Sequence, residues 1–171
     1  ILRQDIIWAK KNCMPESVKD RFTKNHEYIF LFSKQPKYFF NQVLEPVKQV
    51  SIERAKSPMK HRTISTKGVK YDLSDNPNRV VRADGMKNKR SVWNMRTASY
   101  KEAHFAVFPP ELAETCIKAG SDEGDIVLDC FMGSGTTAMV AQDLFRKWIG
   151  VELNPEYEKL IRKRTAQQVL F

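Results

Sequence analysis

The stretch Asp129-Cys-Phe-Met-Gly-Ser-Gly-Thr-Thr137 decides the fold. It follows a short apolar run, Ile126–Leu128, and leads into a helix-forming segment that continues to Leu144. The apolar run predicts a strand, and the two glycines let the backbone turn tightly into the helix. A second run, Lys147–Glu152, predicts another strand. This order of strand, glycine loop, helix and strand indicates half of a nucleotide-binding βαβ unit in an α/β domain.

Two carboxylates flank the glycine loop. Glu152 follows Gly133 by about twenty residues, the spacing at which an acidic side chain can accept both hydroxyls of a ribose. Asp129 would repel a pyrophosphate but pair with the ammonium group of a methionine moiety, which favours S-adenosylmethionine. A dinucleotide stays open because Gly133 to Ala138 also satisfy the loose G-x-G-x-x-G/A pattern, and so does a strand and turn with no ligand. A P-loop is excluded because no Lys follows the second glycine.

The composition is that of an ordinary globular protein. The 171 residues suit one domain with an inserted lobe, and 42% hydrophobic residues are enough for a core. No apolar run approaches the roughly 20 residues that span a bilayer, and the N-terminus has no signal-peptide pattern, so we expect a cytoplasmic protein without a membrane segment. The three cysteines lack metal-ligand spacing, so we expect no metal and no disulfide framework.

The net charge of +9 is concentrated in the middle of the chain. Residues 45–104 carry 14 Lys and Arg against 6 Asp and Glu, whereas residues 105–171 carry 7 against 10. Such a basic segment favours nucleic acid as a partner before membrane, with a merely solvated basic surface as the alternative. Trp93 could stack on a base or simply anchor the lobe. The candidate DNA contacts are Arg79, Arg82, Lys87, Lys89, Arg90, Trp93 and Arg96.

Three regions follow from the patterns along the chain. Residues 1–41 contain a strand at Asp5–Lys10, a surface loop, and an antiparallel hairpin of a buried strand, His26–Phe32, with Tyr38–Asn41. Residues 42–103 are basic and rich in turn signals, which indicates an inserted, loop-rich lobe.

The third region, residues 104–171, holds the glycine loop between two helices. The first is predicted at Glu111–Ala119, with Leu112, Cys116 and Ala119 on its inner face, and the second runs from the cap Asn154 to about Gln168. Because the nucleotide-binding strands come last, the other parallel strands must come from earlier in the chain. The order of the elements is therefore permuted.

Segments along the chain resemble a known family. Asp129–Thr137 resembles the D-P-F-x-G-S/T-G-T cofactor motif of bacterial and phage DNA amino-methyltransferases of the β class. Gly150–Tyr157 follows it as in that family, and most of 42–90 is unmatched. The other similar segments are His104–Leu112, which looks like the second cofactor motif, and Leu2–Lys10, Met14–Arg21 and His26–Lys34, which look like those after the catalytic motif.

The resemblance implies a Rossmann-like class I methyltransferase fold in permuted order, a mostly parallel sheet with an antiparallel hairpin, and a target-recognition lobe. It implies methyl transfer from S-adenosylmethionine to cytosine N4 or adenine N6 of a base flipped out of double-stranded DNA, by a DNA-associated protein in a bacterial or phage-infected cell. Restriction-modification and a homodimer are further expectations from the family.

By resemblance, the cofactor's contacts can be carried onto this sequence. Phe105 and Phe131 would flank the adenine, Asp129 and Thr136 would meet the methionine end, and Glu152 would hold the ribose. Cys130 stands where the family usually has Pro, and Phe145 where Gly is common. The complete set of candidates is Phe105, Ala106, Asp129, Phe131, Gly133, Ser134, Gly135, Thr136, Thr137, Glu152 and Asn154.

The family's catalytic motif, (D/N/S)-P-P-(Y/F), is absent from this sequence. Phe108-Pro-Pro-Glu111 lacks both the polar first residue and the aromatic fourth residue. We therefore assign no catalytic residue and expect the motif upstream of Ile1. The residue that opens the motif correlates with the target base, and the segment Met14–Ser17 slightly favours cytosine.

Other functions remain open from the sequence. The same fold could methylate RNA or protein, or could bind nucleic acid without catalysis. An NAD-dependent enzyme is a third alternative, since the glycine pattern fits a dinucleotide as well.

Overall fold

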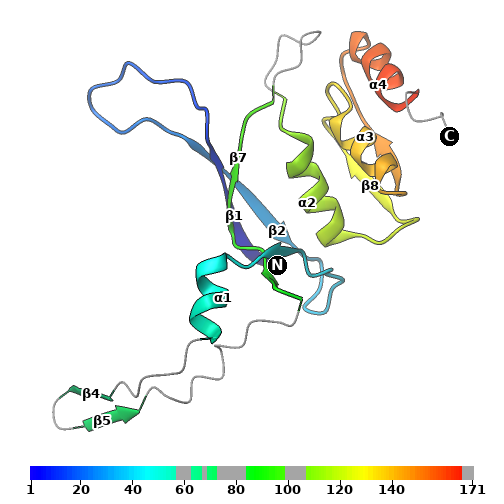
Figure 1. Cartoon of the computed structure of the whole chain (residues 1–171). Helices are drawn as coiled ribbons and strands as arrows, with labels where there is room; N and C mark the ends of the chain where they lie inside the picture. The colour runs from blue at the N-terminus through cyan, green and yellow to red at the C-terminus, as the bar shows by residue number, and fades with distance from the viewer. Residues whose placement is uncertain (57–62, 67–68, 73–83, 99–106, 167–171) are drawn as a thin grey trace. The chain divides into compact units, whose positions relative to one another are not determined.

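The computed structural model describes residues 1–56, 63–66, 69–72, 84–98 and 107–166 (Figure 1). Contacts divide the chain into two compact units: Ile1–Val43 together with Arg90–Phe171, and Leu44–Lys89. Within the described ranges, no helix is long and apolar enough to cross a membrane. The same ranges contain no group of three or more His, Cys, Asp or Glu side chains that could hold a metal ion.

The first unit contains a three-stranded sheet with β1 (Leu2–Lys10) in its centre. β2 (His26–Phe32) pairs with β1 in antiparallel orientation, and β7 (Val92–Met95) pairs with it in parallel orientation. Alternate residues of β1 and β7 are buried, as expected for strands with one covered face. The buried cluster consists of Ile6, Trp8, Trp93 and Met95.

Two predictions about β2 are wrong. Residues 38–41 form no strand; the antiparallel partner of β2 is β1, and the connection between them is the long segment 11–25. Asn41 lies instead near the end of α2 (Pro110–Gly120), where its backbone N–H donates to the Ala119 carbonyl at 2.9 Å. β2 is also only half-buried, because Tyr28, Phe30 and Phe32 are exposed. Of the described side chains of β2, Ile29 and Leu31 pack on the core cluster.

α2 (Pro110–Gly120) packs on two sides. Leu112 and Cys116 contact the cluster of the three-stranded sheet, as predicted, while Ala113 and Ile117 pack against Val140 and Ala141 of α3 (Thr136–Asp143). Burial raises the pKa of the Cys116 thiol to about 11, so the thiol stays neutral at physiological pH. The helix therefore joins the sheet to the glycine-loop region.

The predicted strand, glycine loop, helix and strand are confirmed. β8 (Ile126–Asp129) and β9 (Lys147–Gly150) are parallel, with Asp129 opposite Gly150, and α3 connects them. The last helix, α4 (Glu156–Ala166), follows Asn154, whose side-chain oxygen accepts the Glu156 N–H at 3.0 Å. This is the N-cap that the sequence predicts.

The second unit contains short elements within the predicted lobe. β3 (Leu44–Pro46) and β6 (Met86–Asn88) form an antiparallel pair, and β4 (Thr63–Thr66) pairs with β5 (Val69–Asp72). α1 (Gln49–Lys56) follows β3. The unit Leu44–Lys89 is shorter than the predicted lobe 42–103, because β7 belongs to the first unit through its pairing with β1.

Candidate functional site

The glycine loop adopts a conformation that requires its glycines. Gly133 has φ +55°, and Gly135, the N-cap of α3, has φ +85°. Both values lie in the left-handed region, which side chains other than glycine's rarely permit. A Cβ atom on Gly135 would also lie 3.1 Å from Ile161 Cα. Glycine at 135 thus allows both the turn and the close approach of α4.

Asp129 holds the loop from the end of β8. Its Oδ1 accepts the Phe131 N–H at 2.9 Å, and its Oδ2 accepts the Thr137 hydroxyl at 2.5 Å. The carboxylate thereby connects the strand end to the first turn of α3. Each of its oxygens keeps a lone-pair site for a further donor.

Glu152 holds the same loop from beyond β9. Its Oε2 accepts the Gly133 N–H at 2.7 Å, and its Oε1 accepts the Asn154 N–H at 2.9 Å. The backbone N–H groups of Asn154 and Gly133 hold the pKa of the Glu152 carboxyl below its usual range. The side chain is therefore ionised at neutral pH. The two carboxylates bind amides only two residues apart, at Phe131 and Gly133.

The two carboxylates line different cavities of the first unit. Asp129 and Thr137 line a cavity of about 370 Å³ beside α2, together with Phe108 and Leu112. Glu152 and Asn154 line a cavity of about 540 Å³ beside α4. The glycine loop is thus bonded to one acidic group in each cavity.

Ser134 and Thr136 are both bound by an arginine of the last helix. Arg164 of α4 donates from Nη1 to Thr136 Oγ1 at 2.7 Å and to Ser134 Oγ at 3.2 Å. Thr136 is 2% exposed and Ser134 6% exposed. The hydroxyl that contacts Asp129 is that of the neighbouring Thr137. Contact of Thr136 with the methionine end stays a prediction.

The remaining cofactor candidates are only partly described. Phe131 is 90% exposed at the loop, so its ring is accessible to a ligand. Asn154 contacts Glu152 through its backbone N–H. Phe105 and Ala106 lie outside the described residues.

The candidate DNA contacts have different environments. Arg90 and Arg96 are exposed, Lys87 forms an ion pair with Glu45 at 2.7 Å, and Lys89 is half-buried. Trp93 is 8% exposed in the core cluster, and its Nε1 donates to the Arg90 carbonyl at 2.7 Å. Its ring packs in the core of the sheet, which favours the anchoring role, and base stacking stays a prediction. Arg79 and Arg82 lie outside the described part of the chain.

Arg164 was not predicted from the sequence, although a signal for it exists. Tyr157, Leu160 and Ile161 stand at positions i, i+3 and i+4 of the last helix, and all three are half-buried. Arg164 follows at i+7 on the same face. A charged residue on an inward face indicates a specific polar partner.

Known proteins match this chain over almost its whole length. The family model described as DNA methylase (N6_N4_Mtase) matches residues 1–163. Type II methyltransferase M.SmaI of Serratia marcescens is 44% identical over 169 residues, which cover 98% of this chain and 47% of that protein. Type II methyltransferase M.XycI of Xanthomonas campestris pv. cyanopsidis is 41% identical over 167 residues, which cover 98% and 45%.

Solved structures with the same fold are also found. The complex of M1.HpyAVI with SAM matches with a TM-score of 0.58 and 26% identity, covering 96% of this chain and 62% of that chain. The cytosine-N4-specific PvuII DNA methyltransferase matches with a TM-score of 0.64 and 19% identity, covering 98% and 52%. At this identity the second match shows the fold alone. The chain spans about half the length of the curated relatives it matches.

Proposed function

Because the chain belongs to the N6/N4 DNA methylase family, we propose that it supplies the S-adenosylmethionine site of an enzyme that methylates an exocyclic amine of a DNA base. The predicted class I methyltransferase fold is confirmed by the solved relatives. The activity is a proposal because the chain spans about half the length of its curated relatives.

One observation carries the proposal: the carboxylates of Asp129 and Glu152 both accept hydrogen bonds from the backbone of a single glycine loop. Glu152 keeps acceptor capacity for ribose hydroxyls, and Asp129 can attract the ammonium group of the methionine moiety. Within the described residues no side chain caps the N-terminus of α3, so its first-turn N–H groups can face a carboxylate. Because the two carboxylates line different cavities, a single donor would have to extend from one cavity to the other to meet both.

Bound S-adenosylmethionine would supply an electrophilic methyl group on a sulfonium sulfur. The residues of this chain bind and orient the donor: Asp129 and Glu152 fix its two ends, and the glycines permit close approach of the backbone. Phe131 offers an exposed aromatic face to the adenine. The family's Pro-Pro-aromatic motif, which residues 1–171 do not contain, would hold the acceptor base.

The acceptor we propose is a base flipped out of duplex DNA, with cytosine N4 slightly favoured by Met14–Ser17. The unit Leu44–Lys89 lies within the basic middle of the chain, which supports the division into a catalytic part (1–41), a target-recognition part (42–103) and a cofactor part (104–171). Among the described residues, Arg90 is an exposed candidate for a phosphate contact, and Arg96 is an exposed candidate for stacking on or reading a base. A homodimer, expected from the family resemblance, remains part of the proposal.

Calorimetry with residues 1–171 tests the cofactor assignment. We expect S-adenosylmethionine to release heat and NAD⁺ to release none. Asp129→Asn and Glu152→Gln should each weaken binding by about tenfold, because each removes a charged acceptor. Binding of NAD⁺ without binding of S-adenosylmethionine would overturn the assignment.

A methyl-transfer assay separates the remaining alternatives. We expect residues 1–171 to transfer no methyl group to duplex DNA, because the Pro-Pro-aromatic motif is absent. A full-length protein containing that motif should methylate duplex DNA and neither RNA nor protein. Turnover by residues 1–171 alone would contradict the role assigned to the motif.

A further inference from the structure

Arg164 of α4 contacts the buried side of the glycine loop. Arg164 binds the hydroxyls of Thr136 and Ser134, both on buried residues. A guanidinium stays charged at every physiological pH and offers several donors in a fixed plane. Hydrogen bonds from a charged donor to buried hydroxyls are stronger than those between neutral groups.

The Arg164 contacts lie between a contact of Glu152 and a contact of Asp129. Along the loop, Gly133 binds Glu152, Ser134 binds Arg164, Thr136 binds Arg164 and Thr137 binds Asp129. The contacts of Gly133 and Thr137 are therefore each one residue away from a hydroxyl that Arg164 holds. A loop with two left-handed glycines has little conformational preference of its own, so these side-chain contacts help to fix its shape, together with the backbone bond from the Gly135 N–H to the Met132 carbonyl at 3.0 Å.

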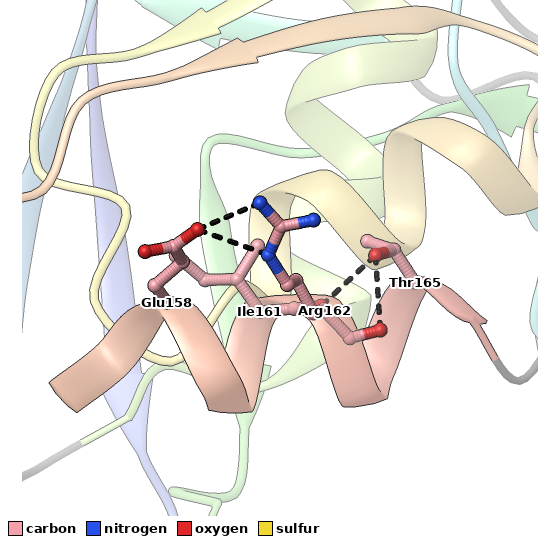
Figure 2. Close-up of polar contacts among 4 residues, drawn as sticks. All are labelled: Glu158, Ile161, Arg162 and Thr165. Carbon is pink, nitrogen blue, oxygen red and sulfur yellow. Dashed lines mark hydrogen bonds and ion pairs between the residues drawn. The ribbon is translucent and has the colours of Figure 1, made fainter. Parts of the chain in front are cut away.

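Other contacts keep α4 in place against the loop. The backbone of Ile161 lies next to Gly135, and the Gln142 side chain of α3 donates to the Thr165 carbonyl at 3.1 Å. Figure 2 shows Ile161 and Thr165 one turn apart on α4, where the Thr165 hydroxyl donates to the Ile161 carbonyl at 2.9 Å. The helix is thus a fixed support from which Arg164 reaches the loop.

We propose that Arg164 is a positioning residue for S-adenosylmethionine. It orients Ser134 and Thr136 so that the Gly133 N–H meets Glu152 and the Thr137 hydroxyl meets Asp129. The inference rests on the proposed cofactor function, but its effect on the loop exists without any ligand. Arg164 itself need not touch the cofactor.

Hydrogen exchange of the ligand-free chain tests the effect on the loop. Arg164→Met should speed exchange of the amides from Gly133 to Thr137 by about tenfold, while amides of β1 and β2 keep their rates. Arg162→Met is the matched control, because the Arg162 side chain is 77% exposed and pairs with Glu158 at 2.7 Å (Figure 2). It should leave the exchange of the loop unchanged. Unchanged loop exchange in Arg164→Met, or equal acceleration throughout the chain, would overturn the proposal.

A double-mutant cycle on cofactor affinity tests the route through Thr136. Arg164→Met and Thr136→Val should each raise the Kd for S-adenosylmethionine by about tenfold, and the double variant should lose little more than either single one. Thr136→Ser keeps the hydroxyl and should keep the affinity. Additive losses would overturn the proposed route. If the wild-type chain binds no S-adenosylmethionine, the proposed function fails, whereas the exchange experiment still decides the role of Arg164.

Discussion

Glu152 holds the glycine loop and, in the proposed function, also binds the ribose of the donor. Its two oxygens accept the N–H groups of Gly133 and Asn154. These N–H groups stabilise the ionised form, which is why the pKa of the carboxyl is lowered. The same bonds fix the orientation in which the side chain would meet a ribose.

Substituting Glu152 by Gln should make stability depend less on pH. The lowered pKa of Glu152 stabilises the folded state at pH values above the unfolded pKa, and this contribution is lost as pH falls through the folded pKa. The wild-type chain should therefore be more stable than Glu152→Gln at pH 7, and the difference should shrink on acidification. Urea unfolding at several pH values measures it. A difference that stays constant down to pH 3 would contradict this role.

Trp93 and Arg96 lie in one segment but should have opposite roles. Trp93 is buried and Arg96 is exposed. Trp93→Ala should lower the free energy of unfolding by about 3–5 kcal/mol, as for other large core side chains. Arg96→Ala should change it by less than about 0.5 kcal/mol. Denaturant unfolding checks both values. A Trp93→Ala variant with wild-type stability and weakened DNA binding would favour base stacking over a core role for Trp93.

Among the elements, those with local signals were predicted and those that depend on distant partners were not. The strand, glycine loop, helix and strand around Gly135 are marked by apolar runs, turn residues and an N-cap that are adjacent in sequence. The partner of β2 was missed because β1 lies across the connection 11–25, and apolar runs do not show which strands pair. In β7 the buried Trp93 and Met95 alternate with exposed residues, which is a local signal of a strand with one covered face. The basic residues around this segment led to the prediction that it belongs to the lobe.

The approach of α4 to the loop can be measured with two glycine substitutions. Gly135 and Gly124 both have φ +85°. A Cβ at Gly135 would meet Ile161, whereas one at Gly124 has no neighbour within 4 Å in the described structure. Gly124→Ala should therefore cost only the backbone strain, about 1–3 kcal/mol, and Gly135→Ala should cost more. Equal losses in denaturant unfolding would show that α4 can move away without cost.

For the whole molecule, the sequence predicted the family, because several separated segments carry that information. It did not predict the boundary of the second unit, since Leu44–Lys89 is delimited by the pairing of β7 with β1. It also did not predict that Arg164 contacts Ser134 and Thr136, because a motif gives the residues but not the direction of their side chains.

Binding of the chain to duplex DNA should weaken as salt rises, since phosphate contacts release counterions. Arg96→Ala should reduce the slope of log affinity against log salt by about 1. Lys118→Ala removes the same charge from the acidic region of the chain, where Lys118 pairs with Glu114, and should leave the slope unchanged. Equal slopes for both variants would show that net charge, rather than a defined contact, drives the binding.

The parallel pairing of β1 with β7 has a consequence for how the protein reaches its folded state. The hydrogen bond from Trp8 to Met95 joins residues 87 positions apart, whereas β8, α3 and β9 lie within one short segment. Closing such a long stretch of backbone costs conformational entropy before any contact is gained, which slows the step. We expect the βαβ unit to form early during refolding and the central sheet to form last, so that Trp8 and Trp93 fluorescence reports the slowest phase.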